Sequence, residues 1–227
     1  MKAKNMIASA VIAGMMVSGA GYAYWTDALT VDNTVATGNL DVQFTKAFGL
    51  PHQINKDNAG ENYMTGSITQ TADTLTVTME DMYPGAMSLY AAKAENFGSI
   101  PAVLDHVNVT FSEQAGALGN DVKAAGGFIQ MSSKHRIKDG GYFTGTLDSL
   151  EDDLNAMLEN VQMEPGDYIL FDIPEEHKDE VAAAIPAYNP SEENCIIFYL
   201  DDQSGNETEN LRTQFDIDFN WKQHNAQ

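Results

Sequence analysis

Cysteine, positive charge and long hydrophobic runs are all scarce in this sequence, and each scarcity excludes a structural feature or a class of partner. A single cysteine, Cys195, rules out a disulfide within the chain. Lys and Arg number 12 against 33 Asp and Glu, which gives a formal net charge of −21. Nucleic acids and anionic membrane surfaces attract basic proteins, so neither is an expected partner. Basic proteins and divalent cations are compatible with such a charge.

Familiar catalytic motifs are missing as well. The chain has no His-Glu-x-x-His zinc motif, no Gly-x-Ser-x-Gly elbow and no Cys-x-x-Cys pair. His177 and Glu180 share a predicted helix, but the acidic residues around them indicate a solvated face. The acidic run over residues 201–207 lacks the EF-hand spacing and predicts a hairpin loop. We therefore predict no catalytic residue and no cofactor. Calcium or zinc binding has no motif in its favour, and a metal site assembled only by the fold stays open.

The first 23 residues have the three-part pattern of a secretory signal peptide. Lys2 and Lys4 form a basic start, residues 6–18 are apolar or small, and Gly21 and Ala23 suit the −3 and −1 positions of a cleavage site. The apolar part is shorter than the ~20 residues that a membrane span needs, which favours a cleaved signal peptide. The alternative is that the segment stays uncleaved as an amino-terminal anchor. Cleavage between Ala23 and Tyr24 would release a secreted chain of net charge −23, because the leader holds two lysines and no acid.

Apolar and polar residues alternate with a period of two through much of the remaining chain, as half-buried antiparallel strands require. Cys195 opens a short apolar run and is predicted to be a buried small hydrophobe on a strand. The predicted strands cover residues 40–44, 75–79, 107–111, 128–137, 168–173, 195–200 and 215–221.

Helical spacing occurs only over residues 148–161 and 175–185. Pro84-Gly85 and Pro165-Gly166 predict turns, and residues 139–141 and 204–206 predict loops. These features together predict a mainly β protein. We expect a jelly-roll-like antiparallel β-sandwich with a few helices inserted in its loops, and a single domain over residues 24–227.

Several short segments stand out along the chain. They are residues 23–27 (AYWTD), residues 36–42 (ATGNLDV) with Gly38, Leu40 and Asp41, the turn at Pro84 and Gly85, the Asn96-x-Gly98 segment, and residues 214–221 (QFDIDFNW). In content and order these segments resemble the TasA and camelysin family of secreted biofilm-matrix proteins, although residues 112–190 do not align and Ala86 replaces the usual Asp after the Pro-Gly turn.

This resemblance implies a fold and a function. The fold would be a jelly roll that polymerises into extracellular fibres, with the amino-terminal strand of one subunit completing the sheet of the next. A dedicated signal peptidase would process the chain, and its partners would be other copies of itself and other matrix proteins in the extracellular matrix or at the cell surface. Two alternatives stay open: a secreted metallo-endopeptidase, as some family members are classed, or an accessory subunit that nucleates another protein's fibre.

The residues that follow the predicted cleavage site indicate, independently of the resemblance, that this segment binds in a groove. Residues 24–35 carry large apolar side chains at Tyr24, Trp25, Leu29, Val31 and Val35, among Thr, Asp and Asn. Leaving two aromatic rings in water forgoes burial of ~150–250 Å² each, so the segment needs a groove. That groove can belong to the same subunit, where the segment is an ordinary edge strand, or to a neighbour. The family resemblance favours the neighbour.

Overall fold

Two antiparallel sheets make up most of the chain that the structure describes. This computed structural model describes residues 38–53, 64–113, 118–185, 188, 195–205, 208 and 211–224, of which the side chains of 50–53 and 112–113 are not considered. The predicted signal peptide, the Ala23–Tyr24 junction and the candidate donor strand lie outside the described residues. The described residues belong to one compact unit that begins at Gly38.

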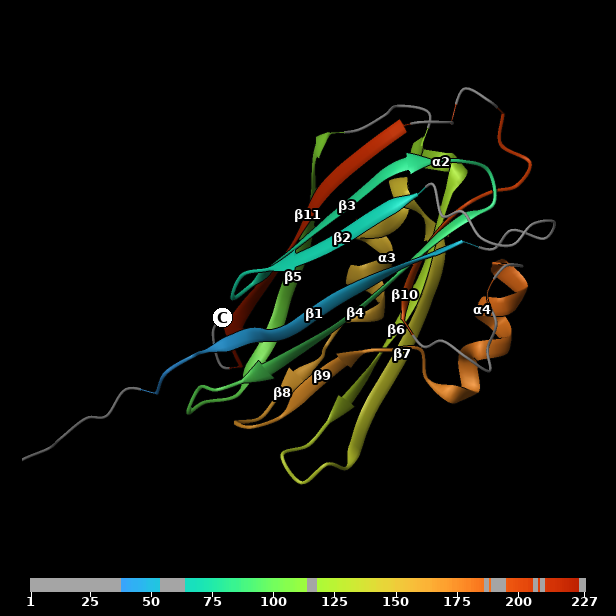
Figure 1. Cartoon of the computed structure of the whole chain (residues 1–227). Coiled ribbons are helices and arrows are strands. Elements are labelled where there is room, and N and C mark those ends of the chain that lie inside the picture. The colour runs from blue at the N-terminus through green and yellow to red at the C-terminus, as the bar shows by residue number, and fades with distance from the viewer. Residues whose placement is uncertain are drawn as a thin grey trace, which may run out of the picture. The chain divides into compact units, whose positions relative to one another are not determined.

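Sheet A runs in the order β1, β4, β10, β6, β7, with β9 also paired to β4 and β6 (Figure 1). Its strands are β1 (Val42–Gln53), β4 (Ala86–Asn96), β6 (Val122–Met131), β7 (Ile137–Thr146), β9 (Tyr168–Phe171) and β10 (Ile196–Leu200).

Two short strands share one place in sheet A. β10 pairs with the first half of β4, up to Tyr90, and β9 pairs with the second half, from Ala92 onward. Both also pair with β6, β10 near its start and β9 near its end. The sheet is therefore interrupted between the end of β9 and the start of β10, opposite Ala91.

Sheet B runs in the order β2, β3, β11, β5, β8. Its strands are β2 (Thr65–Gln70), β3 (Thr74–Met82), β5 (Ala102–Glu113), β8 (Gln162–Met163) and β11 (Leu211–Gln223). The alternation read from residues 215–221 is realised in β11, where Phe215, Ile217 and Phe219 are buried and the residues between them are half-buried.

Aromatic rings join the two sheets in the core. Phe198 of sheet A contacts Phe215 of sheet B edge-on, with centroids 5.5 Å apart. Phe44 and Phe171 of sheet A both meet Phe219 of sheet B, at 5.0 and 5.4 Å. Such pairs add ~0.5–1.5 kcal/mol each to the burial itself. The prediction of a mainly β antiparallel sandwich is confirmed.

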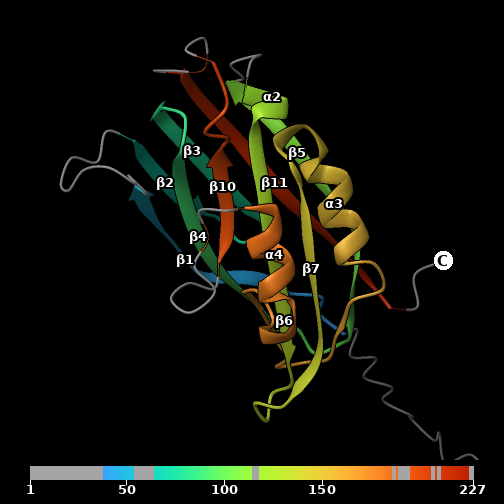
Figure 2. The ribbon, with the colours of Figure 1, turned by 90° about the vertical axis from the view of Figure 1, so that its right-hand side faces the viewer.

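Short helices fill the connections, as expected. The predicted helix at 148–161 is present as η1 (Leu147–Ser149) followed by α3 (Leu150–Met157), and the one at 175–185 as η2 (Glu175–His177) followed by α4 (Lys178–Ala184). A further helix, α2 (Leu118–Asp121), precedes β6. α3 lies alongside β7 and β5, and α4 lies against the outer face of sheet A (Figure 2).

Several details of the sequence prediction were wrong. The helix predicted to 161 ends at Met157, the strand predicted to 173 ends at Phe171, and β2 and β4 were not predicted. The apolar run 128–137 is not one strand, because the chain reverses at Ser132–Arg136 and the run divides between β6 and β7. The predicted loop at 139–141 lies within β7, where Gly141 leaves room for the Phe128 ring across the strand pair. Cys195 precedes β10 by one residue and is half-buried rather than buried.

Phe198→Ala should lower the free energy of unfolding by about 4 kcal/mol, because it removes a fully buried ring from between the sheets. Urea unfolding followed by circular dichroism measures the loss. Phe48→Ala is the matched control, since Phe48 is 56% exposed and its truncation should cost less than ~1 kcal/mol. Equal losses in the two variants would contradict the assignment of Phe198 to the core.

Candidate functional site: a clamp at the amino end and a groove on sheet A

Two of the segments singled out in the sequence meet at the start of β1. The amides of Phe97 and Gly98 donate to the carbonyl of Asp41, at 2.7 and 3.1 Å. The amide of Ser99 donates to the carbonyl of Asn39 at 2.9 Å, and the amide of Asn39 donates to Ser99 Oγ at 2.9 Å. We call residues 38–41 together with 96–100 the amino-terminal clamp. Its hydrogen bonds fix the chain shortly after residues 24–35 in sequence.

Asn96 is the centre of the clamp and is fully buried. Its Nδ2 donates to the carbonyls of Ile100 and Met163, at 3.1 and 2.9 Å, while its Oδ1 accepts from the amide of Gly98 at 2.9 Å. Asn96 belongs to β4 of sheet A and Met163 to β8 of sheet B, so one side chain links the two sheets. A buried amide with all these partners is stabilising, whereas one lacking them would be costly.

Glycine is required in the clamp for space rather than for flexibility. A Cβ on Gly98 would collide with the carbonyl oxygen of Asn39 and lie 2.8 Å from the amide nitrogen of Asp41. A Cβ on Gly38 would overlap the side chain of Ile100. Both close approaches bring the two motif segments together. Leu40, predicted with them, is half-buried and packs against the core.

The Pro84-Gly85 turn lies at the other end of β4 from the clamp. Gly85 has φ +88°, as predicted, and the amide of Ala86 donates to the carbonyl of Tyr83 at 2.9 Å. The second predicted turn, at Pro165-Gly166, also has a positive φ of 82° at Gly166. The structure therefore assigns Pro84 and Gly85 to the β3–β4 connection and does not bring them to the clamp.

An apolar depression lies where sheet A is interrupted, and we call it the outer groove. Its volume is about 330 Å³. The small side chain of Ala91 contributes to it from β4, and Phe48 contributes a largely exposed ring from β1. The full lining is Lys46, Phe48, Ala91, Ala92, Lys93, Leu170, Phe171, Asp172 and Cys195.

Asp172 is the carboxyl group in this lining. Burial raises the pKa of Asp172 to about 6, and the Ile173 amide and the Lys178 charge oppose that rise only in part. Its Oδ1 is buried and has no hydrogen-bond partner within the described part of the chain. Lys46 and Lys93 stand at the same groove, and Lys93 also pairs with Glu95 at 2.7 Å and lies over the Tyr168 ring.

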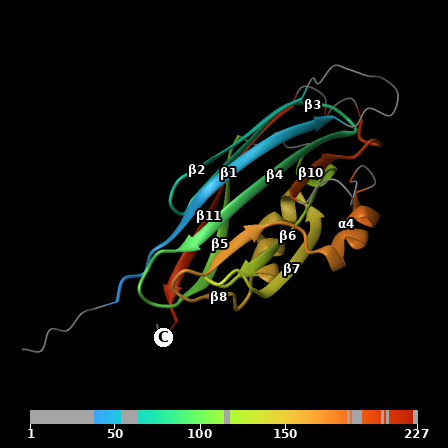
Figure 3. The ribbon, with the colours of Figure 1, turned by 60° about the horizontal axis from the view of Figure 1, so that its bottom comes forward.

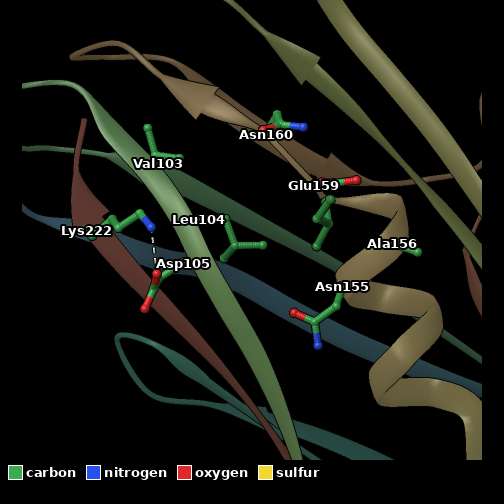
Figure 4. Close-up of a pocket in the computed structure, with 9 residues that line it drawn as sticks. Val103, Leu104, Asp105, Asn155, Ala156, Glu159, Asn160 and Lys222 are labelled. Atoms are coloured by element: carbon green, nitrogen blue, oxygen red, sulfur yellow. Dashed lines mark hydrogen bonds and ion pairs between the residues drawn. The ribbon is translucent and has the colours of Figure 1, made fainter. Parts of the chain in front are cut away.

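A larger cavity of about 470 Å³ lies between β5 and the end of α3 (Figure 4). Lys222 and Asp105 form an ion pair at 2.8 Å on its rim. Lys222, and after it His106, hold the pKa of Asp105 below its ordinary value by hydrogen bonding to the carboxylate. Opposite charges on this rim therefore neutralise each other.

Side chains of α3 bind the free edge of β5 above that cavity. Asn155 Oδ1 accepts from the amide of Val107 and its Nδ2 donates to the carbonyl of the same residue, both at 2.8 Å. Glu151 accepts from the amide of Val109 at 2.8 Å. These are the bonds that a neighbouring strand would make, so α3 protects this edge from pairing with another chain.

The remaining candidates from the sequence have local partners. Asp201, in the acidic loop, pairs with Lys123 at 2.6 Å, and that pairing lowers the pKa of Asp201. His177 stacks on Tyr142 at 4.2 Å, while Glu180 is exposed. Within the described residues, no group of three or more His, Cys, Asp or Glu side chains is placed to hold a metal ion. No helix among them is long and apolar enough to cross a membrane.

Comparisons with protein-family models, with curated proteins and with solved structures found no match. The arguments for function therefore rest on the residues of this chain. Sequence reasoning located the clamp segments but missed the outer groove, because its lining comes from β1, β4, β9 and the residue before β10. An apolar Phe48 beside Lys46 was the one local signal.

Gly98→Ala should destabilise the protein by about 2 kcal/mol, because the added methyl group displaces the carbonyl of Asn39 and breaks the clamp. Urea unfolding measures the loss, and faster hydrogen exchange at the amides of Phe97 and Ser99 locates it. Phe97→Ala, in the same turn but on a half-exposed side chain, serves as the control and should be close to neutral. Unchanged exchange in Gly98→Ala would contradict the clamp.

Asp172→Asn should stabilise the protein at neutral pH and not at pH 4. The folded pKa of about 6 exceeds the ordinary 3.8, so the folded state holds the proton more tightly and wild-type stability falls as pH rises through this window. After allowance for partial solvation we expect a gain of about 1 kcal/mol at pH 7.5. Thermal melts across pH 4–8 test this, with exposed Glu159→Gln as control. A gain that is the same at every pH would refute the assignment.

Proposed function

We propose that this chain is the secreted structural subunit of an extracellular fibre or pilus-like biofilm-matrix filament, which grows when the amino-terminal strand of one subunit adds to the next. The observation that carries the proposal is the position of residues 24–35. Residues 36–41 connect them to β1, the edge strand of sheet A, and the clamp holds the last four of these connecting residues. A segment rich in aromatic and β-branched residues is thus attached to a rigid domain at a fixed point.

Free sheet edges decide where such a segment can bind. The start of β1 is already occupied on its outer side, since the amide of Phe44 donates to the carbonyl of Ala72 at 2.7 Å and Gln70 Nε2 donates to the carbonyl of Phe44 at 3.3 Å (Figure 3). α3 occupies β5. These two stretches of edge are filled in every subunit, so an added strand would use another part of the neighbouring subunit. A head-to-tail operation that does not close then produces a filament.

The acidic surface supports the same function. A mature charge of −23 keeps subunits and finished filaments apart at low ionic strength, and salt or acid weakens that repulsion. Filaments should therefore bundle laterally as salt rises or pH falls, while the strand-mediated contact along the filament persists.

Electron microscopy of the purified mature chain should show filaments, and a variant lacking residues 24–35 should stay monomeric because it has no strand to add. Size-exclusion chromatography with light scattering gives the mass of the truncated form, and circular dichroism confirms that it is folded. Filaments from the truncated chain would reject strand addition. Casein digestion that a chelator abolishes would instead support the peptidase function, and incorporation only into another protein's fibres would support an accessory subunit.

A further inference from the structure

The outer groove is a built feature of sheet A rather than a gap between side chains. β9 and β10 meet the same strand, β4, end to end, and the residue between their pairing partners is Ala91. The small side chain of Ala91 leaves the interruption open, whereas Leu89, the preceding residue on the same face of β4, is covered together with Val181 of α4. The apolar face is thus covered beside α4 and left open at the groove.

The groove has the composition of a binding site for a large apolar side chain. Phe48 is 56% exposed on its rim, in a protein whose surface is otherwise dominated by acidic residues. Leu170 adds further apolar lining, and the Asp172 carboxyl offers a hydrogen-bond acceptor. An apolar cavity with one polar acceptor fits an indole ring, which must find a partner for its single N–H when it is buried.

We propose that the outer groove binds Trp25 of a second copy of this chain. The proposal rests on the proposed function for the role of residues 24–35. In an extended segment Trp25 and Asp27 point to the same side, ~7 Å apart. With the indole of Trp25 in the groove and its N–H donated to Asp172, Asp27 would lie on the side of the segment that faces Lys46, while Lys93 keeps its ion pair with Glu95.

Charge favours this occupant. Residues 24–35 contain Asp27 and Asp32 and no Lys or Arg, so the segment is acidic. The domain as a whole would repel it, but two of the chain's 12 basic residues stand at this groove. Opposite charges at a binding site steer the approach of a partner and select its orientation.

One route to the segment's own groove is obstructed at its start. A segment that folded back at the clamp and paired along the outer edge of β1 would meet the contacts of Phe44 with Ala72 and of Gln70 with Phe44. This obstruction favours an occupant from another copy.

Trp25 fluorescence tests the proposal in the mature chain. Trp25 and Trp221 are the two tryptophans, so Trp221→Phe makes Trp25 the sole reporter. Its emission should move to shorter wavelength as protein concentration rises. Ala91→Phe, which fills the groove, should abolish the shift. Lys46→Glu should raise the concentration needed at least about tenfold, which corresponds to ~1.4 kcal/mol, and Lys134→Glu, an exposed lysine outside the groove, should leave it unchanged.

Each contrary result overturns the proposal. A shift that does not depend on concentration means that Trp25 binds its own subunit. A shift that survives both Ala91→Phe and Lys46→Glu means that it binds elsewhere, and no shift at any concentration means that it stays in water. Lys46→Glu changes an exposed residue and should fold normally, so the test stands even where Ala91→Phe misfolds. Filaments that form regardless of these variants would reject binding of Trp25 in the groove but leave the fibre function standing. A concentration-dependent shift without filaments would support binding in the groove and reject the fibre function.

Discussion

Burial of one face of each sheet against the other is the constraint on which the rest of this structure depends. The aromatic contacts of Phe44, Phe198, Phe215 and Phe219 fix how the sheets face each other. Once they do, buried polar groups have to be satisfied across the same interface. Asn96 and Gln130 both donate from sheet A to carbonyls in β8, and the Tyr90 hydroxyl donates to a carbonyl in β3 at 3.2 Å. Burial raises the pKa of Tyr90 to about 12, so this donor keeps its proton at any physiological pH.

A sandwich made this way leaves edges, and the chain deals with them differently. On one side the β2–β3 turn binds the backbone of β1 near Phe44. On the other side, helix α3 covers the edge of β5. Leu150 and Leu154 anchor α3 in the core, and Asn155 and Glu151 accept hydrogen bonds from backbone amides of β5. The central position of sheet A is treated in a third way, since β9 and β10 divide it and leave the outer groove between them. Within the described residues, the proposed fibre subunit thus combines protected stretches of β1 and β5 with an open apolar groove.

Local patterns in the sequence predicted those strands and turns that are determined by residues close together in the chain. Alternation identified β3, β5 and β11, and Pro-Gly turns placed Gly85 and Gly166 at positive φ. The glycine-rich stretch at 139–141 misled because its role is set by Phe128 on the adjacent strand and not by its neighbours in sequence. The clamp residues could be singled out from their motifs, but their meeting could not, and the groove required four separated segments to come together. Such non-local features become visible only with the register of the sheets.

The clamp also has a mechanical meaning. A pull on the chain at Gly38 acts along β1, and the hydrogen bonds between β1 and β4 run across that direction over the whole strand pair, from Val42 to Gln53. The load is therefore divided among many bonds in shear instead of opening them one at a time. Asn96 passes part of it to Met163 in the opposite sheet. Tension applied to a subunit through its amino end would therefore be spread over both sheets.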